Sequence, residues 1–134
     1  MVGKGKEKVM EDYVIRPKFE IHLTNCDIDD IMATALDSGI SYWCYKAEVV
    51  GGVYHGEWAS DEISRGGRLR LYDNESDDKW ILTKMKFIKG FTRWIECGWG
   101  RDAICDGQVD CGMIDAVAAD QIVQFALFND IVFG

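Results

Sequence analysis

The stretch RLRLYDNESDDKWILT, residues 68–83, predicts a β-hairpin. Two short runs, RLRLYD and KWILT, flank the polar segment NESDD, and polar segments of this kind connect antiparallel strands. Side chains alternate along a strand, so Leu69 and Leu71 are expected on one face. The opposite face would carry Arg68, Arg70 and Tyr72. A hairpin with one apolar face needs another layer of structure to cover that face.

The segments before the hairpin predict a strand followed by a helix. In KFEIHLT, residues 18–24, apolar and polar side chains alternate, as expected of a half-buried strand. Thr24 and Asp27 have the spacing of a capping box, although the acid is one carbon shorter than the usual glutamate. A helix over residues 26–37 is expected to follow, and Gly39 is expected to end it.

Two more helices are predicted after the hairpin. Thr83 can cap KMKFIKGFTRWIE, residues 84–96, in which apolar side chains form a broad stripe opposite basic ones. Residues 100–112, GRDAICDGQVDCG, predict a loop. The following segment, MIDAVAADQIVQFALF, residues 113–128, is apolar over most of its helical circumference. We therefore expect this last helix to be buried against the sheet.

The middle of the chain, residues 40–58, is the least regular part of the pattern. Its aromatic and β-branched residues favour a strand that ends near Val50, where a glycine pair interrupts it. Taken with the hairpin and the helices, this order predicts an α+β fold. We expect a single domain over residues 18–134, with a small antiparallel sheet packed against about three helices. Residues 1–17 lack periodicity and predict a flexible N-terminal tail.

The composition narrows the classes of protein to consider. The chain has 134 residues, 48% of them hydrophobic, which is enough for a core without metal or disulfide staples. A net charge of −8 argues against direct binding of nucleic acid, because that requires a basic footprint. Its apolar runs fall short of the roughly 20 residues needed to cross a membrane, so we expect a cytoplasmic protein. The five cysteines contain no CxxC pair and are expected to be reduced thiols, with no metal or cofactor.

The basic turn SRGGRLR, residues 64–70, allows two interpretations. Its glycines could leave backbone N–H groups free beside Arg65 and Arg68, and such a turn could hold one phosphate. Alternatively, Gly66 and Gly67 only end a helical turn and begin the next strand. The acidic segment that follows lacks the sixth-position glycine and the twelfth-position glutamate of a calcium loop. We interpret that segment as a charged hairpin turn.

An aromatic segment precedes the basic turn. WCYKAEVVGGVYHGEW, residues 43–58, gathers aromatic side chains around flexible glycines. Rings on loops can stack on a nucleobase while neighbouring cations neutralise its phosphates, although the same rings could belong to the core or to a protein interface. The candidate ligand-binding residues are Trp43, Lys46, Tyr54, His55, Trp58, Arg65, Gly66 and Arg68.

Acidic side chains form a second candidate surface. They could present a negative field to an arginine-lined groove of a partner protein, although they could also serve solubility alone. These residues are Asp27, Asp29, Asp30, Asp61, Glu62, Asp73, Glu75, Asp77 and Asp78. The chain contains neither a recognisable nucleophile motif nor a zinc-protease motif, so the sequence predicts binding rather than catalysis.

Three segments carry a resemblance to a known group of proteins. DIDDIMATALDSGISYWCYKAEVVGG, ASDEISRGGRLRLYDNESDDKWILT and ADQIVQFALFNDIVFG resemble small proteins carried by phages and prophages of gut Firmicutes. The resemblance covers roughly residues 18–134 and brings no catalytic residues with it. It implies a counter-defence protein that acts in the bacterial host cytoplasm by stoichiometric binding.

Two functions are expected from these observations. The first is sequestration of a nucleotide immune signal, such as a cyclic ADP-ribose isomer or a cyclic dinucleotide, by a homo-oligomer with a pocket of aromatics and arginines. The second is an acidic, anti-CRISPR-type inhibitor that occupies the nucleic-acid channel of a defence nuclease. We favour the first, because an acidic chain that places arginines next to glycines and aromatics concentrates local positive charge.

Overall fold

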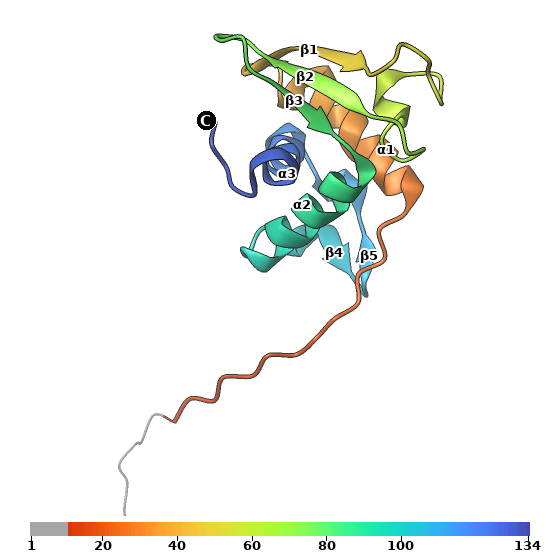
Figure 1. Cartoon of the computed structure of the whole chain (residues 1–134). Coiled ribbons are helices and arrows are strands. Elements are labelled where there is room, and N and C mark those ends of the chain that lie inside the picture. The colour runs from red at the N-terminus through yellow and green to blue at the C-terminus, as the bar shows by residue number, and fades with distance from the viewer. Residues whose placement is uncertain (1–10) are drawn as a thin grey trace, which may run out of the picture.

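The computed structural model describes residues 11–134, so the first ten residues of the predicted tail lie outside the described part. This part forms three α-helices, one three-stranded sheet and one two-stranded sheet. The helices are α1 (Asn25–Thr34), α2 (Lys84–Glu96) and α3 (Ala116–Phe128). The strands are β1 (Cys44–Val49), β2 (Leu69–Asp73), β3 (Lys79–Leu82), β4 (Ile104–Cys105) and β5 (Gln108–Val109). The predicted α+β fold is confirmed, and the helices all lie beneath one face of the larger sheet (Figure 1).

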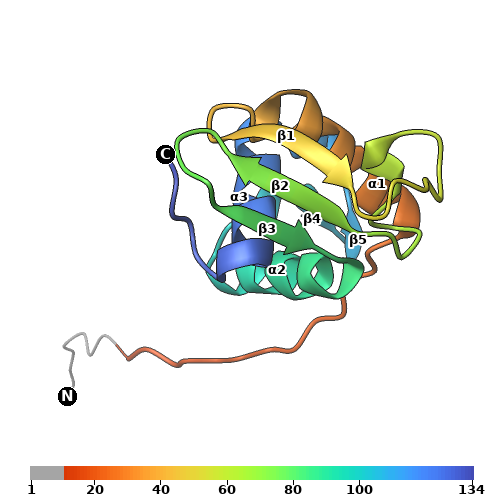
Figure 2. The same cartoon turned by 45° about the horizontal axis from the view of Figure 1, so that its top comes forward.

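The larger sheet is antiparallel, with the strand order β1-β2-β3. The predicted hairpin forms β2 and β3, which pair from Leu69 with Leu82 to Tyr72 with Lys79. Leu69, Leu71 and Leu82 are all 0% exposed, which confirms the predicted apolar face of the hairpin. This inner face of the sheet covers the core, while its other face points away from all three helices (Figure 2).

The helices meet beneath the sheet. α2 and α3 pack against each other, and α3 also contacts β3 and the π-helical turn Ala35–Gly39 that continues α1. α2 and α3 come very close at Gly90, where a Cβ atom would lie 2.4 Å from the Cα of Ala126. Such a distance leaves room only for glycine, so Gly90 sets the separation of α2 and α3.

Side-chain caps fix where the helices begin. Thr24 accepts a hydrogen bond from the Asp27 N–H at 3.1 Å, and the Asp27 carboxylate accepts one from the Thr24 N–H at 2.9 Å, so the predicted capping box is confirmed. Thr83 caps α2 as predicted, by accepting from the Lys86 N–H. The third helix begins later than predicted, because Asp115 supplies the cap at the Ala118 N–H.

Two predictions about local structure were wrong. Residues 18–24 are extended but make only one parallel bridge, between His22 and Gln108, because their partner β5 is two residues long. The predicted loop over residues 100–112 contains the small β4-β5 hairpin. The alternation within residues 18–24 still predicts which side chains face the core, since Ile21 and Leu23 pack against it.

The C-terminal segment is held against the core by buried polar groups. Gln124 is 0% exposed, and its side-chain oxygen accepts hydrogen bonds of 2.8 Å from the N–H groups of Val132 and Phe133. The ring of Phe133 stacks on Trp43, with ring centres 4.8 Å apart. These contacts place the end of the chain beside the sheet (Figures 1 and 2).

Within residues 11–134, no helix combines the length and the apolar character required to span a membrane.

Candidate functional site

The eight candidate ligand-binding residues fall in three different places. Trp43 is a core residue, 2% exposed, whose indole N–H donates to the buried carboxylate of Asp120 at 2.7 Å. The proposal that its ring stacks on a ligand is therefore corrected, because no face of the ring is free. Lys46 on β1 and Arg68, which directly precedes β2, are both exposed. The remaining candidates, Tyr54, His55, Trp58, Arg65 and Gly66, lie in the segment between β1 and β2.

The backbone N–H groups at the centre of the basic turn, those of Arg65, Gly66 and Gly67, all donate hydrogen bonds within the fold. The N–H groups of Arg65 and Gly67 both donate to the carbonyl of Glu62, and the Gly66 N–H donates to that of Ile63. Gly66 adopts a φ of +84°, which suits glycine. The Arg65 guanidinium donates to the Asp61 carbonyl at 3.1 Å and lies 3.6 Å from the Asp29 carboxylate. This geometry favours the capping interpretation of the turn over a phosphate nest.

A buried carboxylate organises the aromatic segment that precedes the turn. Glu62 is 0% exposed and accepts hydrogen bonds from the N–H groups of His55, at 2.7 Å, and Gly56, at 2.9 Å. Its other oxygen lies 2.9 Å from Nδ1 of His55. Burial acts to raise the pKa of this carboxyl, but these hydrogen bonds outweigh it and lower the pKa. Glu62 thus holds the loop in place, and it does not belong to the predicted acidic surface.

The aromatic side chains of this loop remain exposed. Tyr54 is 53% exposed and Trp58 is 64% exposed. Trp58 borders a shallow, open cleft of about 560 Å³ against the C-terminal end of α1, together with Leu36 and Asp37. The Arg65 side chain lies beside Gly56 of this loop and is already engaged by Asp29 and Asp61. An anionic ligand would therefore have to compete with these partners here.

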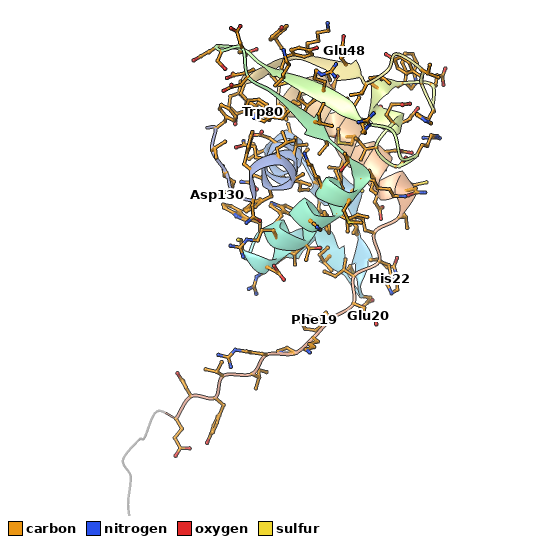
Figure 3. The ribbon with its side chains drawn as sticks, viewed as in Figure 1. Phe19, Glu20, His22, Glu48, Trp80 and Asp130 are labelled. Atoms are coloured by element: carbon orange, nitrogen blue, oxygen red, sulfur yellow. The ribbon has the colours of Figure 1, made fainter. Side chains whose placement is uncertain are left out.

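The uncovered side of the sheet combines cations with aromatic rings. We call it the outer face and define it by Tyr45, Lys46, Glu48, Arg70, Tyr72 and Lys79, together with Arg68, which directly precedes β2 and whose carbonyl accepts a hydrogen bond from the Val50 N–H. The strand register aligns Lys46 with Tyr72 and Lys79, and it aligns Glu48 with Arg70. Alternation places Arg68 on the same side as Arg70, as the sequence predicts. In Figure 3, Glu48 lies on the side of the sheet away from the helices, whereas Trp80 lies on the side that faces them.

Glu48 is the centre of the hydrogen-bond network on the outer face. It accepts a hydrogen bond of 2.6 Å from the Tyr72 hydroxyl and one of 3.0 Å from Arg70, and the Lys46 ammonium lies 3.3 Å away. These three partners, with Tyr72 contributing most, lower the pKa of Glu48 to about 2. The carboxylate therefore stays ionised at physiological pH and orients Arg70 and Lys46 before any ligand binds.

Two tyrosine rings lie among the cations of this face. The ammonium groups of Lys46 and Lys79 lie 5.2 Å and 5.8 Å from the centre of the Tyr72 ring. Tyr45 is 65% exposed, and its ring centre is 5.7 Å from that of Tyr72. A β-bulge between Cys44 and Lys46 shifts the register there, which brings Tyr45 to the ring of Tyr72.

The outer face is locally basic although the whole chain is acidic. It carries four cations, Lys46, Arg68, Arg70 and Lys79, and one carboxylate, Glu48. The whole chain has a net charge of −8. Among the described residues, Arg68 and Lys79 form no ion pair. Exposed rings next to unpaired cations can stack on a planar base and neutralise phosphates at the same time.

The predicted acidic surface is divided in the structure. Several of its carboxylates bond within the fold, because Asp29 accepts from the Ser64 hydroxyl at 2.5 Å and Asp73 accepts from the Ser76 hydroxyl at 2.6 Å. The exposed acids of the hairpin turn, Glu75, Asp77 and Asp78, remain free to face a partner. In residues 11–134, no group of three or more His, Cys, Asp or Glu side chains could hold a metal ion.

Sequence reasoning identified only part of the outer face. Alternation in RLRLYD predicted that Arg68, Arg70 and Tyr72 share a side. The sequence did not indicate that Glu48 and Lys79 join this face. Their positions follow from the strand register, which no local pattern specifies. Comparisons with protein-family models, with curated proteins and with solved structures find no match to this chain.

Proposed function

We propose that this protein binds a nucleotide-type anion on the outer face of its sheet and sequesters it without converting it. The observation that carries the proposal is the concentration of four cations around Tyr72 and Tyr45 on an uncovered face of an acidic chain. Long-range repulsion by the rest of the protein disfavours unspecific polyanions, so a small ligand fits this face better than a nucleic-acid strand does.

Different residues of the outer face would contact different parts of the nucleotide. Tyr45 is the more exposed ring and offers a stacking surface for a base, which is worth about 1–3 kcal/mol in proteins that bind single strands. Arg68 and Lys79 supply cations that form no ion pair with any carboxylate in residues 11–134. Glu48 holds Arg70 in a fixed position, which reduces the entropy lost when a phosphate binds.

The biological role in this proposal follows from the resemblance to phage and prophage proteins. A counter-defence protein without catalytic chemistry can act by lowering the free concentration of a nucleotide immune signal. Cyclic dinucleotides and cyclic ADP-ribose isomers combine planar bases with phosphates, which are the two groups that the outer face can recognise.

Isothermal titration with a panel of such nucleotides tests the proposal. We expect at least one to bind, with an affinity that falls as salt rises, because counterions are released on binding. Lys79→Ala and Arg68→Ala should each weaken binding about tenfold, since a charge-assisted hydrogen bond contributes about 1.5 kcal/mol or more. Arg93→Ala, at an exposed position on α2, is the matched control and should bind like the wild type. Failure of every nucleotide in the panel to bind would refute the proposal.

Recovery of the ligand separates sequestration from catalysis. After incubation, heat release and mass spectrometry should return the nucleotide with its mass unchanged. A shifted mass, with turnover proportional to the amount of protein, would show an enzyme instead.

The alternative proposal is inhibition of a defence nuclease by the acidic side chains. It rests on the exposed carboxylates of Glu75, Asp77 and Asp78 at the hairpin turn. Substituting these three residues with asparagine or glutamine would abolish inhibition in that case, while Lys79→Ala would have no effect. If the outer face carries the function instead, Lys79→Ala should weaken nucleotide binding, while the three substitutions at the hairpin turn should leave nucleotide binding unchanged.

A further inference from the structure

The N-terminal arm, residues 11–19, carries several strongly exposed apolar side chains. Tyr13, Val14, Ile15 and Phe19 are between 74% and 80% exposed. Figures 1 and 2 both show this segment running away from the folded body. Apolar side chains gathered on one short segment are costly to leave in water, and they often mark a site of protein association.

The root of the arm is fixed to the body. The His22 N–H donates a hydrogen bond of 2.7 Å to the carbonyl of Gly107, and His22 forms the parallel bridge to Gln108. Pro17 stands between this root and Tyr13, Val14 and Ile15. Proline restricts its own backbone and favours an extended conformation at the residue before it, which agrees with the extended course of the arm away from the body (Figures 1 and 2).

An apolar groove lies where the arm leaves the body. One part, of about 330 Å³, is lined mainly by Ile21, Leu23, Ile88, Phe91 and Ile95. A second part, of about 810 Å³, shares Phe19, Ile21 and Ile95 with the first and extends to Ile104. Figure 3 shows Phe19 and Glu20 at the root of the arm, next to His22.

Charges on the arm complement those of the groove. Arg16 and Lys18 flank Pro17 on the arm, while Glu11 and Asp12 lie on the other side of its apolar residues. Three carboxylates and one cation line the two parts of the groove, namely Glu20, Glu96, Asp106 and Arg101, so its lining is acidic on balance. An arm laid in such a groove would bury its apolar side chains and bring its cations to the acidic rim.

We propose that two copies of this chain exchange their N-terminal arms, so that residues 13–15 of each copy occupy the groove of the other. The arm of the same copy runs away from its own body and leaves residues 13–15 exposed, so these residues are free to reach a second copy (Figures 1 and 2). The groove and the root of the arm adjoin each other. Under a twofold axis, each arm can therefore fill the groove of the other copy, and the assembly closes as a dimer. The dimer does not depend on the outer face and goes beyond the proposed function.

Oligomeric state provides the first test. Native mass spectrometry and light scattering of the full chain in the micromolar range should show a dimer. Ile15→Asp on the arm and Ile88→Asp in the groove should each raise the dimer dissociation constant about 100-fold or more, because each buries a charge. Val117→Asp, at an apolar position that is 65% exposed on α3, is the matched control and should remain dimeric. Circular dichroism verifies that each variant is folded.

Cross-linking between isotopically distinct copies provides the second test. Ile15→Cys would place a thiol on the arm, and Cys97 and Cys105 are exposed thiols beside Ile95 and Ile104 of the groove. Mixed ¹⁴N and ¹⁵N copies are oxidised mildly and digested. We expect disulfide-linked peptides that join residue 15 of one label to residue 97 or 105 of the other. A monomer in the micromolar range, or a link found only within copies of one label, would overturn the proposal.

Discussion

Glu62→Ala tests whether one buried carboxylate holds the loop between β1 and β2 in place. The side chain is 0% exposed and accepts hydrogen bonds from two backbone N–H groups, those of His55 and Gly56. Each buried donor left without a partner costs about 1–3 kcal/mol. The loop is near the surface, so water can partly replace the carboxylate, and removal of a buried charge offsets some of the loss. We therefore expect the free energy of unfolding to fall by about 3 kcal/mol.

Thermal unfolding measures this effect directly. For a domain of this size, 1 kcal/mol corresponds to roughly 4 °C in Tm, so Glu62→Ala should lower Tm by about 10 °C. Glu57→Ala, which removes an exposed carboxylate from the same loop, is the control and should change the free energy of unfolding by less than about 0.5 kcal/mol. Equal effects of the two substitutions would show that Glu62 does not organise the loop.

The pH dependence of the same pair gives an independent check. Hydrogen bonds in the folded state lower the pKa of Glu62 from its ordinary value of 4.5. The stabilisation is therefore complete above pH 4.5 and is lost as the pH falls through the folded-state pKa. The difference in Tm between the wild type and Glu62→Ala should shrink on acidification. A difference that grows as the pH falls from 5 to 3 would contradict the assigned direction of the pKa shift.

Three further predictions concern the core and the cysteines. Gly90→Ala should lower the free energy of unfolding, measured in urea, by about 1–3 kcal/mol, because the new Cβ would lie 2.4 Å from the Cα of Ala126. This loss should outweigh the higher helix propensity of alanine. A stabilised variant would contradict the close approach of α2 and α3. Gln124→Leu should expose the C-terminal segment to carboxypeptidase, because two backbone N–H groups lose their acceptor; an unchanged digestion rate would argue against the clamp. Burial raises the pKa of the Cys111 thiol to about 12. Iodoacetamide should therefore modify Cys111 at least about 100-fold more slowly than the exposed Cys97. Equal modification rates at the two thiols would contradict the burial of Cys111.

The elements that the sequence predicts well are those that local interactions determine. The capping box of Thr24 and the cap of Thr83 depend on residues three positions apart, and both form as predicted. The two faces of the β2-β3 hairpin follow from alternation alone, which is why Leu69 and Leu71 are buried as expected.

The features that the sequence does not reveal depend on contacts between distant segments. Trp43 resembles a loop aromatic in the sequence, but its burial depends on Asp120 and Phe133, which lie far along the chain. Glu62 resembles a surface acid until the loop folds back and donates its N–H groups. Likewise, the short length of β5 explains why residues 18–24 alternate like a strand without forming one.

Mapping the ligand site by NMR is the most direct test of the proposed function. Amide chemical shifts of the ¹⁵N-labelled chain are followed while the tightest-binding nucleotide of the panel is added. Binding at the outer face predicts that the largest changes lie in β1, β2 and β3, at Lys46, Glu48, Arg70, Tyr72 and their neighbours. Changes confined to the loop around Trp58, or spread over the acidic hairpin turn alone, would contradict the assignment of the ligand to this face.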